Sequence, residues 1–318
     1  MLKDKVIFIT GGAGFIGTAL CGRFHKNNKI ILYDNGHRNA LQYFDFKDHE
    51  NVTVIEGDIL DKELLKKSVK NADIVIHAAA IAGVSSYYKM PLKTMQVNMV
   101  GTYTLLEVIR EIDIELMMYF STSEIYGPHV FRAHEQGETI QGDLKDARWT
   151  YSISKLAAEK LCYCYFWEEK VPFIAVRPFN VYGPGQVGEG AIQIFTTKAL
   201  NNEDIIITGD GVQIRSWCYI DDFADAIEAC SDRVKIVGNS FNIGNPQATV
   251  TILELANKVK NILGSQSNIV FHEHMGVDVQ LRVPDISKAQ KMLGFDPKVS
   301  LEEGLEKTIN WYRENLKV

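Results

Sequence analysis

The sequence predicts an α/β fold, a doubly wound parallel sheet joined to a smaller α/β lobe. Three observations predict it. Short apolar segments alternate with segments of helical period along the first half of the chain, a glycine-rich turn follows the first of them, and the texture changes after residue 183, where shorter elements begin. We therefore expect a larger domain over residues 1–182 and a smaller lobe mainly over 183–318, with some of the chain crossing back to the first domain.

The expected strands of the sheet are short, apolar and rich in β-branched residues. In chain order they are residues 5–10, 29–34, 51–58, 72–80, 115–123 and 172–180. Segments of helical period lie between most of them, the longest over 92–112 and 151–169. Strands that alternate with helices indicate a parallel sheet covered on both faces, because the crossover connections are right-handed.

The smaller lobe is predicted from shorter segments. Its expected strands and helices lie at residues 204–211, 215–230, 239–245 and 251–263. An amphipathic helix over 300–315 closes the chain, and Ser300 with Glu303 forms a capping box at its start. The polar segment 127–149 is long for a loop in a compact domain, and such loops are often functional.

Composition excludes several classes of function. The 318 residues are 46% hydrophobic and 23% charged, with a net charge of −6, which is typical of a soluble globular protein. No basic stripe indicates a nucleic-acid partner, and no segment approaches the roughly 18 apolar residues of a membrane span. The five cysteines are odd in number and lack C-x-x-C spacing, which favours reduced thiols in a cytoplasmic protein and no metal site.

The segment "FITGGAGFIG" (8–17) closes the first expected strand and opens a helix near Phe15 and Ile16. Its glycines Gly11, Gly14 and Gly17 let the backbone turn sharply and approach a pyrophosphate, which would meet the helix N-terminus. This context predicts a dinucleotide site in a Rossmann-type domain.

Asp34 ends the second expected strand, 23 residues after Gly11. A carboxylate there can accept hydrogen bonds from ribose hydroxyls and would repel a 2′-phosphate. Asn35 and Gly36 follow, with no arginine immediately after Asp34. The sequence therefore predicts NAD rather than NADP as the cofactor.

Two further strand ends are expected to flank the adenine and the far ribose. They are "GDI" (57–59), with Asp58 and Ile59, and "HAAA" (77–80), with Ala78, Ala79 and Ala80. Each segment, taken alone, is also compatible with ordinary packing at a strand end.

Tyr151 and Lys155 lie at positions i and i+4 of an expected helix, so both side chains share one face. A free tyrosine has a pKa of about 10, too high for a base at neutral pH. The Lys155 ammonium, together with the cationic nicotinamide ring, is expected to stabilise the phenolate and lower the pKa of Tyr151.

The order of motifs along the chain resembles the extended short-chain dehydrogenase/reductase family, in particular its NAD-dependent nucleotide-sugar epimerases, dehydratases and decarboxylases. The motifs are "TGGAGFIG" (10–17), "STSEIYG" (121–127), "YSISK" (151–155), "RPFNVYGPG" (177–185) and "GDGVQIRSWCYIDD" (209–222). The resemblance implies that Tyr151 removes a proton from a sugar hydroxyl, usually at C4, while hydride passes to NAD. It assigns Lys155 as the partner of Tyr151 and Thr122 as the hydroxyl that aids the proton transfer.

The resemblance also implies further contacts. Asn180 and Arg215 resemble residues that bind the diphosphate of a nucleotide sugar, and Arg282 is expected to add a second cation, because a guanidinium fork matches phosphate oxygens. We expect Ser85 among the substrate contacts and segment 127–149 over the sugar. Two residues complete the expected cofactor set: Asn98 and Phe179. A homodimer through helices 92–112 and 151–169 is a further expectation, although burial within one subunit also explains their apolar surfaces.

Glu124 indicates chemistry beyond simple epimerisation. Once C4 is a ketone, the hydrogen on C5 becomes acidic, and a glutamate beside Thr122 is a suitable base for it. Hexose 4,6-dehydratases often carry Thr-Asp-Glu, whereas this chain has Thr122, Ser123 and Glu124, a triplet that resembles UDP-glucuronate decarboxylases and some N-acetylhexosamine dehydratases. Ser123 cannot replace the acid of the dehydratases.

The predicted function is therefore oxidation of a nucleotide-linked sugar at C4, followed by dehydration or decarboxylation that uses Glu124. A 4-epimerase and a 4-dehydrogenase are the alternatives within this class, and the nucleotide is UDP, dTDP or GDP. The alternative from another class is an inert NAD-binding sensor. Such a protein would have little reason to retain Thr122, Glu124, Tyr151 and Lys155 together.

Overall fold

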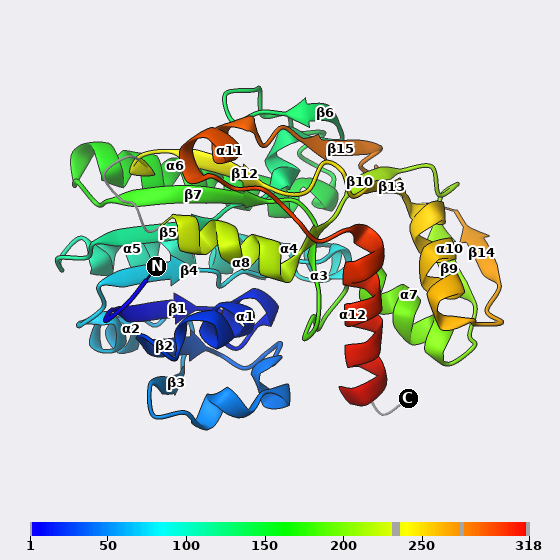
Figure 1. Cartoon of the computed structure of the whole chain (residues 1–318). Helices are drawn as coiled ribbons and strands as arrows, with labels where there is room; N and C mark the ends of the chain where they lie inside the picture. Colours follow the sequence, from blue (N-terminus) through cyan, green and yellow to red (C-terminus); the bar gives the residue numbers. More distant parts are fainter. Residues whose placement is uncertain (1, 231–235, 274–276, 316–318) are drawn as a thin grey trace.

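A computed structural model of the chain describes residues 2–230, 236–273 and 277–315. Its centre is a parallel sheet of seven strands in the order β12-β7-β5-β4-β1-β2-β3. The strands are β1 (Val6–Thr10), β2 (Lys29–Asp34), β3 (Val52–Glu56), β4 (Ile74–His77), β5 (Leu116–Phe120), β7 (Phe173–Pro178) and β12 (Ser240–Ile243). This arrangement confirms the predicted doubly wound sheet (Figure 1).

One strand of this sheet, β12, comes from the part of the chain after residue 183. We expected residues 239–245 in the smaller lobe, but β12 pairs with β7, with Ser240 opposite Ala175. The chain therefore returns to the main sheet after residue 183. The local pattern identified a strand correctly and could not indicate its partner, because pairing across such a sequence distance depends on the whole fold.

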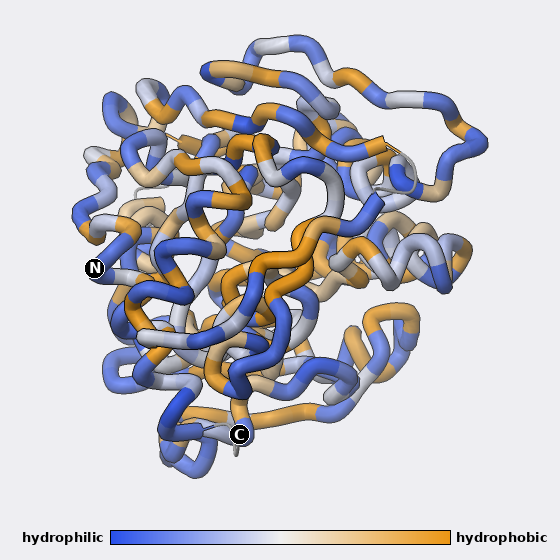
Figure 2. The backbone as a smooth tube through the Cα atoms, turned by 90° about the vertical axis from the view of Figure 1, so that its right-hand side faces the viewer, coloured by the Kyte–Doolittle hydropathy of each residue, from blue (hydrophilic) through white to orange (hydrophobic). Residues whose placement is uncertain are grey.

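Helices cover both faces of the main sheet. Along β1, Ile7 and Ile9 point to one apolar core and Phe8 to the other, as the two-residue period of a strand requires. On one face α1 (Phe15–Phe24) packs against α8 (Ile220–Ala229). On the other face lie α2 (Lys62–Val69), α5 (Gly101–Ile109) and α6 (Thr150–Glu168). Hydrophobic segments are concentrated in the middle of the molecule, with hydrophilic segments around them (Figure 2).

The expected helix 92–112 is interrupted. It consists of α4 (Pro91–Met95), a π-helical turn η3 (Gln96–Val100) and α5. Single π-turns inside α-helices frequently mark functional sites, and this one carries Asn98, a predicted cofactor residue. Helix 151–169 is continuous, as α6.

The second lobe contains a four-stranded sheet and two short parallel pairs. The four-stranded sheet has the order β13 (Thr249–Thr251), β10 (Ile214–Ser216), β15 (Leu281–Pro284) and β6 (His129–Ala133). The pairs are β8 (Val181–Tyr182) with β11 (Cys218–Tyr219), and β9 (Ile205–Thr208) with β14 (Ile269–His272). Since β6 lies within segment 127–149, that segment is partly a strand rather than the long loop that we expected.

Four further helices lie after residue 183 in the described part of the chain. They are α7 (Ala191–Leu200), α10 (Ile252–Leu263), α11 (Ser287–Leu293) and α12 (Leu301–Asn315). The predicted closing helix is α12, and the Oγ of Ser300 accepts a hydrogen bond from the Glu303 N–H at 3.2 Å. The Glu303 carboxylate pairs with Lys307 at 2.7 Å. Within the part of the chain that the structure describes, no helix is long and apolar enough to cross a membrane.

Candidate active site

The carboxyl ends of β1, β4, β5 and β7 lie side by side at one edge of the main sheet, because these strands are parallel neighbours. Parallel sheets of this kind bind their ligands at that edge. The glycine-rich turn, the segment 78–80, the segment 121–124 and the segment 179–180 therefore converge there. The predicted catalytic residues all belong to these segments or to helix α6, and so do the predicted cofactor residues of the glycine-rich turn and of 78–80.

The glycine-rich turn has no room for side chains at several of its glycines. Gly11 has a φ of +69°, and a Cβ there would lie 2.6 Å from the backbone nitrogen of Ala79. A Cβ on Gly17 would lie 2.4 Å from the carbonyl oxygen of Gly11. Helix α1 begins at Phe15, so the N–H groups of Phe15, Ile16 and Gly17 belong to a first turn without intrahelical acceptors. This backbone cradle fits the pyrophosphate of a dinucleotide.

Asp34 lies at the end of β2, beside this cradle. Its carboxylate accepts hydrogen bonds from the N–H groups of Ala13 at 3.1 Å and Gly36 at 2.8 Å. Burial raises the pKa of Asp34, and these and neighbouring backbone N–H groups act in the opposite direction. The side-chain oxygen of Asn35 accepts from the His37 N–H at 3.1 Å. The position of Asp34 beside the turn fits the acceptor that the NAD ribose requires.

The other predicted cofactor residues line the neighbouring strand ends. The side chain of Asn98 bonds the backbone N–H and carbonyl of Ile81 and the hydroxyl of Ser154. Asp58 accepts a bond from the Leu60 N–H at 3.0 Å. Ile59 is buried, and Ala78 to Ala80 follow β4 directly. Asn98 therefore joins the segment after β4 to the catalytic helix.

Phe179 differs from the other predicted cofactor residues. Its side chain is fully buried and stacks on Tyr126 at 6.2 Å between ring centroids. Its N–H donates to the carbonyl of Ile243 at 2.9 Å. The Phe179 side chain therefore packs against Tyr126, and its contact with the cofactor stays a prediction.

The structure places Tyr151 beside Thr122 at the start of α6, with Lys155 one helical turn further along. A hydrogen bond with the Thr122 hydroxyl favours ionisation of Tyr151, but burial and the charge of Glu124 raise the pKa of Tyr151 to about 12. Lys155 is buried, its Nζ lies 4.4 Å from the centre of the Tyr119 ring, and burial lowers its pKa to about 7. The protein alone does not lower the pKa of Tyr151 as we expected, because burial outweighs the favourable contacts.

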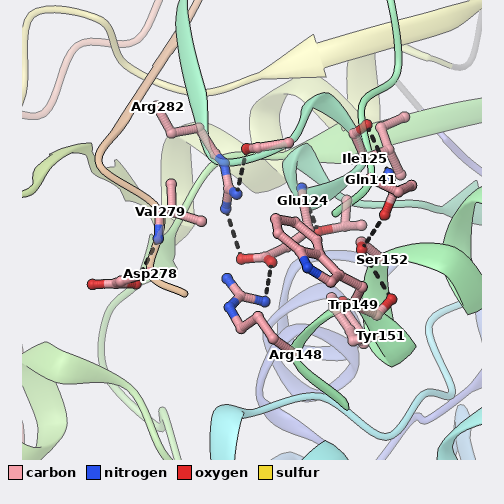
Figure 3. Close-up of polar contacts among 12 residues, drawn as sticks. Glu124, Ile125, Gln141, Arg148, Trp149, Tyr151, Ser152, Asp278, Val279 and Arg282 are labelled. Atoms are coloured by element: carbon pink, nitrogen blue, oxygen red, sulfur yellow. Dashed lines mark hydrogen bonds and ion pairs between the residues drawn. The ribbon is translucent and has the colours of Figure 1, made fainter. Parts of the chain in front are cut away.

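Glu124 lies between two arginines (Figure 3). Its Oε1 accepts a hydrogen bond from Nη1 of Arg282 at 2.6 Å, and its Oε2 lies 2.8 Å from Nη1 of Arg148. The Glu124 N–H donates to the Thr122 hydroxyl at 3.1 Å, which caps the short helix η4 (Ser123–Tyr126). Burial opposes ionisation of Glu124, but the two guanidinium groups outweigh it and lower its pKa to about 2. Glu124 is therefore an ionised carboxylate and a weak base in this arrangement.

Of the predicted substrate residues, the two arginines lie on neighbouring strands. Arg215 and Arg282 are paired positions on β10 and β15, and Arg215 lies 3.5 Å from Asp278. Arg282 is almost fully buried, and its guanidinium donates hydrogen bonds to the Glu124 carboxylate and, at 3.1 Å, to the carbonyl oxygen of Gly127. Its guanidinium is therefore not free to bind a phosphate.

Asn180 and Ser85 have protein partners in this structure. Asn180 has a φ of +37° and donates from its side chain to the carbonyl of Ser216 at 2.7 Å. The N–H of Ser85 donates to the Glu189 carboxylate at 3.0 Å, and its hydroxyl bonds the same group. A substrate that bound either residue would have to compete with these contacts.

Sequence reasoning missed Arg148, and it missed the buried ion pair between Glu159 of the catalytic helix and Arg177. Arg148 is three residues before Tyr151, and a cation beside the Tyr-x-x-x-Lys pattern was the available signal. Glu159 lies one turn beyond Lys155 and accepts three hydrogen bonds from Arg177, at 2.6 to 3.2 Å, and one from Ser121. No local pattern marks that pair.

The network around Arg177 extends into segment 127–149. Nη1 of Arg177 donates to the hydroxyl of Tyr126 at 2.6 Å and to the carbonyl of Glu135 at 3.1 Å. The Tyr126 hydroxyl donates to Asn242 at 2.8 Å, and the Asn242 N–H donates to the Glu135 carboxylate at 2.8 Å. This network therefore fixes segment 127–149 against β12 and the catalytic helix.

The chain is similar to known proteins of one family. The sequence model of the NAD dependent epimerase/dehydratase family matches residues 7–244. The UDP-N-acetyl-alpha-D-glucosaminuronate decarboxylase of Bacillus cytotoxicus is 33% identical over 324 residues, which cover 98% of each protein. UDP-glucuronic acid decarboxylase 1 of Xenopus tropicalis is also 33% identical, over 99% of this chain and 74% of its own.

A solved structure has the same fold. It is the UDP-glucuronic acid 4-epimerase of Bacillus cereus, in complex with UDP-glucuronic acid and NAD. It is 29% identical, with a TM-score of 0.88, over 97% of this chain and 99% of its own. The similarity therefore extends through both lobes of the molecule.

Proposed function

The chain belongs to the NAD-dependent epimerase/dehydratase family, and from this premise we propose that it decarboxylates a UDP-linked sugar acid after oxidising it at C4. The observation that carries the proposal is the position of Glu124 between Arg282 and Arg148. With a pKa of about 2, Glu124 is poorly suited to remove the C5 proton, which dehydration requires and decarboxylation does not.

The first step depends on residues at the start of α6. Tyr151, as its phenolate, takes the proton of the C4 hydroxyl, and Thr122, already hydrogen-bonded to it, aids that transfer. Lys155, as an ammonium, favours the phenolate. When bound, NAD accepts the hydride from C4 and returns it at the end of the cycle. Gly11, Gly14, Phe15, Ile16, Gly17 and Asp34 would hold it.

The second step breaks the bond between C5 and the carboxylate carbon. CO₂ leaves, the electron pair of that bond delocalises into the C4 carbonyl, and a proton then adds to C5. The buried guanidinium groups near Glu124 would stabilise the negative charge that develops there. No acid at C6 is needed, which agrees with Ser123 at the position after Thr122.

The named relatives support the choice of substrate. Two proteins that match nearly the whole chain at 33% identity are decarboxylases of UDP-linked uronic acids. A 4-epimerase of the same fold binds UDP-glucuronic acid. UDP is therefore favoured over dTDP and GDP.

The test uses a panel of nucleotide sugars that includes UDP-glucuronate and UDP-N-acetylglucosaminuronate. Mass spectrometry of the products should show loss of CO₂ from at least one acid. Loss of water would indicate a 4,6-dehydratase, an unchanged mass a 4-epimerase, and accumulation of a 4-keto sugar with NADH a 4-dehydrogenase. The absence of any NADH-like absorbance in single turnover, with bound NAD verified, would identify the inert sensor.

A homodimer through the helical face of α5 and α6 is part of the proposal. Tyr103 and Trp167 are about half exposed there, at 46% and 52%, and Val100 adds to the apolar surface. Light scattering should give the mass of two chains, and Tyr103→Lys should weaken the dimer. A monomeric wild type at micromolar concentration would contradict this part of the proposal.

A cytoplasmic location is also proposed. The five cysteines are free thiols, and all but Cys164 are buried. Free buried thiols fit a reducing compartment. Fractionation of cells that express the tagged protein tests it, and enrichment in a membrane or secreted fraction would contradict it.

A further inference from the structure

The two guanidinium groups around the Glu124 carboxylate form what we call the two-arginine site, defined by Arg148 and Arg282. The side chains of both arginines are almost fully buried, whereas that of Glu124 is 21% exposed. A third arginine, Arg215, is paired in register with Arg282 and contacts Asp278. Positive charge is therefore concentrated beside Tyr151, in a site that already contains a carboxylate.

The two arginines hold Glu124 differently. Arg282 is fixed by two hydrogen bonds, to Oε1 of Glu124 at 2.6 Å and to the carbonyl of Gly127 at 3.1 Å. Nη1 of Arg148 lies 2.8 Å from Oε2 in an ion pair whose N–H is poorly aligned with that oxygen. The Arg148 side of the site is thus electrostatically paired but lacks directed hydrogen bonds.

Arg148 is also placed beside the reacting groups. Its guanidinium lies 5.4 Å from the centre of the Tyr87 ring, and that ring stacks on Tyr151 at 6.4 Å between centroids. The Trp149 ring lies against it at 5.6 Å. Aromatic contacts support a guanidinium without using its N–H donors. The Nη1 donor of Arg148 therefore remains available for a better-aligned acceptor than Glu124.

A planar carboxylate is the acceptor that suits this donor, because a guanidinium fork binds both of its oxygens. We propose that Arg148 exchanges Glu124 for the carboxylate of the sugar acid when the substrate binds, so that Glu124 stands in for that carboxylate in the free enzyme. This inference rests on the proposed function and identifies Arg148 as the residue that recognises the carboxylate of the substrate. After the exchange each arginine has one carboxylate, with Glu124 on Arg282 and the substrate on Arg148.

The exchange would select for acids. A neutral sugar cannot replace Glu124 on Arg148, since a hydroxyl gives no compensating charge for the lost ion pair. The exchange would also remove one of the two charges that keep Glu124 ionised. Glu124 would then be better able to receive and return a proton near C5.

The experiment measures binding of UDP-glucuronate and UDP-glucose to the NAD-loaded enzyme by calorimetry. For Arg148→Gln we expect at least a tenfold loss of affinity for UDP-glucuronate and less than a twofold change for UDP-glucose. Arg132→Gln, at an exposed arginine paired with Asp285, is the matched control and should change neither. Equal weakening of both ligands by Arg148→Gln would overturn the proposal.

Glu124→Gln provides the opposite test, because it removes the competing carboxylate. We expect this variant to bind UDP-glucuronate more tightly, by about tenfold, with UDP-glucose unchanged and with slower turnover. A purely structural role for Glu124 would weaken both ligands. Weaker binding of the acid alone would also contradict the exchange.

A third measurement covers the case in which these variants fold poorly. In Glu124→Ala, added acetate should occupy the two-arginine site and raise the melting temperature more than chloride at the same ionic strength, whereas the wild type should not distinguish the two salts. An equal response to both salts in the variant would count against the inference.

The inference and the proposed function fail in different ways. If the wild type releases no CO₂ from any acid, the proposed function fails. If the wild type decarboxylates the acid and Arg148→Gln retains its preference for acid over neutral sugar, only the exchange fails.

Discussion

Two glutamates face arginines near the catalytic residues, the buried Glu159 and the partly exposed Glu124, and they differ in how completely their hydrogen bonds are satisfied. Glu159 accepts three hydrogen bonds from Arg177 and one from Ser121. Glu124 has one well-directed bond from Arg282 and an ion pair with Arg148 that lacks hydrogen-bond geometry. Removing a partner from a satisfied buried pair leaves an uncompensated charge, so such a pair is fixed. An incompletely satisfied pair can change partners, which suits a binding site.

The largest expected effect is on stability and concerns Glu159. Glu159→Ala leaves the Arg177 guanidinium buried without its carboxylate, and we expect the free energy of unfolding to fall by about 3–5 kcal/mol. Urea denaturation monitored by fluorescence measures it. The control is Glu159→Gln combined with Arg177→Met, which removes both charges and should cost less than the single change. A loss below about 1 kcal/mol in Glu159→Ala would contradict the assignment of this pair as structural.

The second prediction concerns the pH dependence that Glu124 contributes. A pKa lowered from 4.5 to about 2 corresponds to about 3 kcal/mol, at about 1.4 kcal/mol per unit. Because the folded pKa is depressed, this stability is fully present above pH 4.5 and is lost as the pH falls towards 2. The difference in unfolding free energy between wild type and Glu124→Gln should shrink over that window. A difference that does not change with pH would show that the charge of Glu124 is not responsible.

The third prediction is that Glu159 and Glu124 affect the pKa values of different catalytic residues. The charge of Glu159 raises the pKa of Lys155, and the charge of Glu124 raises that of Tyr151. In the pH profile of kcat, Glu159→Gln should move the alkaline limb to lower pH, because the ammonium is lost earlier. Glu124→Gln should move the acidic limb to lower pH, because the phenolate forms earlier. Shifts of about one pH unit are expected, and movement of the same limb in both variants would contradict the separation.

The smallest effect is expected from Ser121→Ala. It removes one of the hydrogen bonds to Glu159 and should cost about 1 kcal/mol of unfolding free energy. The affinity for UDP-glucuronate, measured by calorimetry, should stay unchanged, since Ser121 contacts the structural pair and not the two-arginine site. Changed affinity at unchanged stability would show that the two pairs are coupled.

Local patterns were enough to predict most of the fold and which residues group together in part of the candidate site. The glycine-rich turn and Asp34 lie on adjacent short elements, and Tyr151 and Lys155 are one helical turn apart, so their proximity follows from local geometry. Glu124 was recognised as an unusual residue after a strand, but its partner Arg282 is 158 residues away. We assigned Arg282 to the substrate because arginines bind phosphate, and only the pairing of β15 with β6, where Arg282 is opposite Val130, places it near Glu124.

The late strand β12 has a consequence for how the chain is made. On the ribosome β7 is complete at Pro178, but its outer neighbour does not exist until Ile243 has emerged. Throughout that interval the outer edge of β7 has unpaired backbone N–H and C=O groups. An unpaired edge of an apolar strand can pair with strands of other chains. Synthesis of this protein should therefore have a brief stage at which holdase chaperones matter most, between the emergence of these two strands.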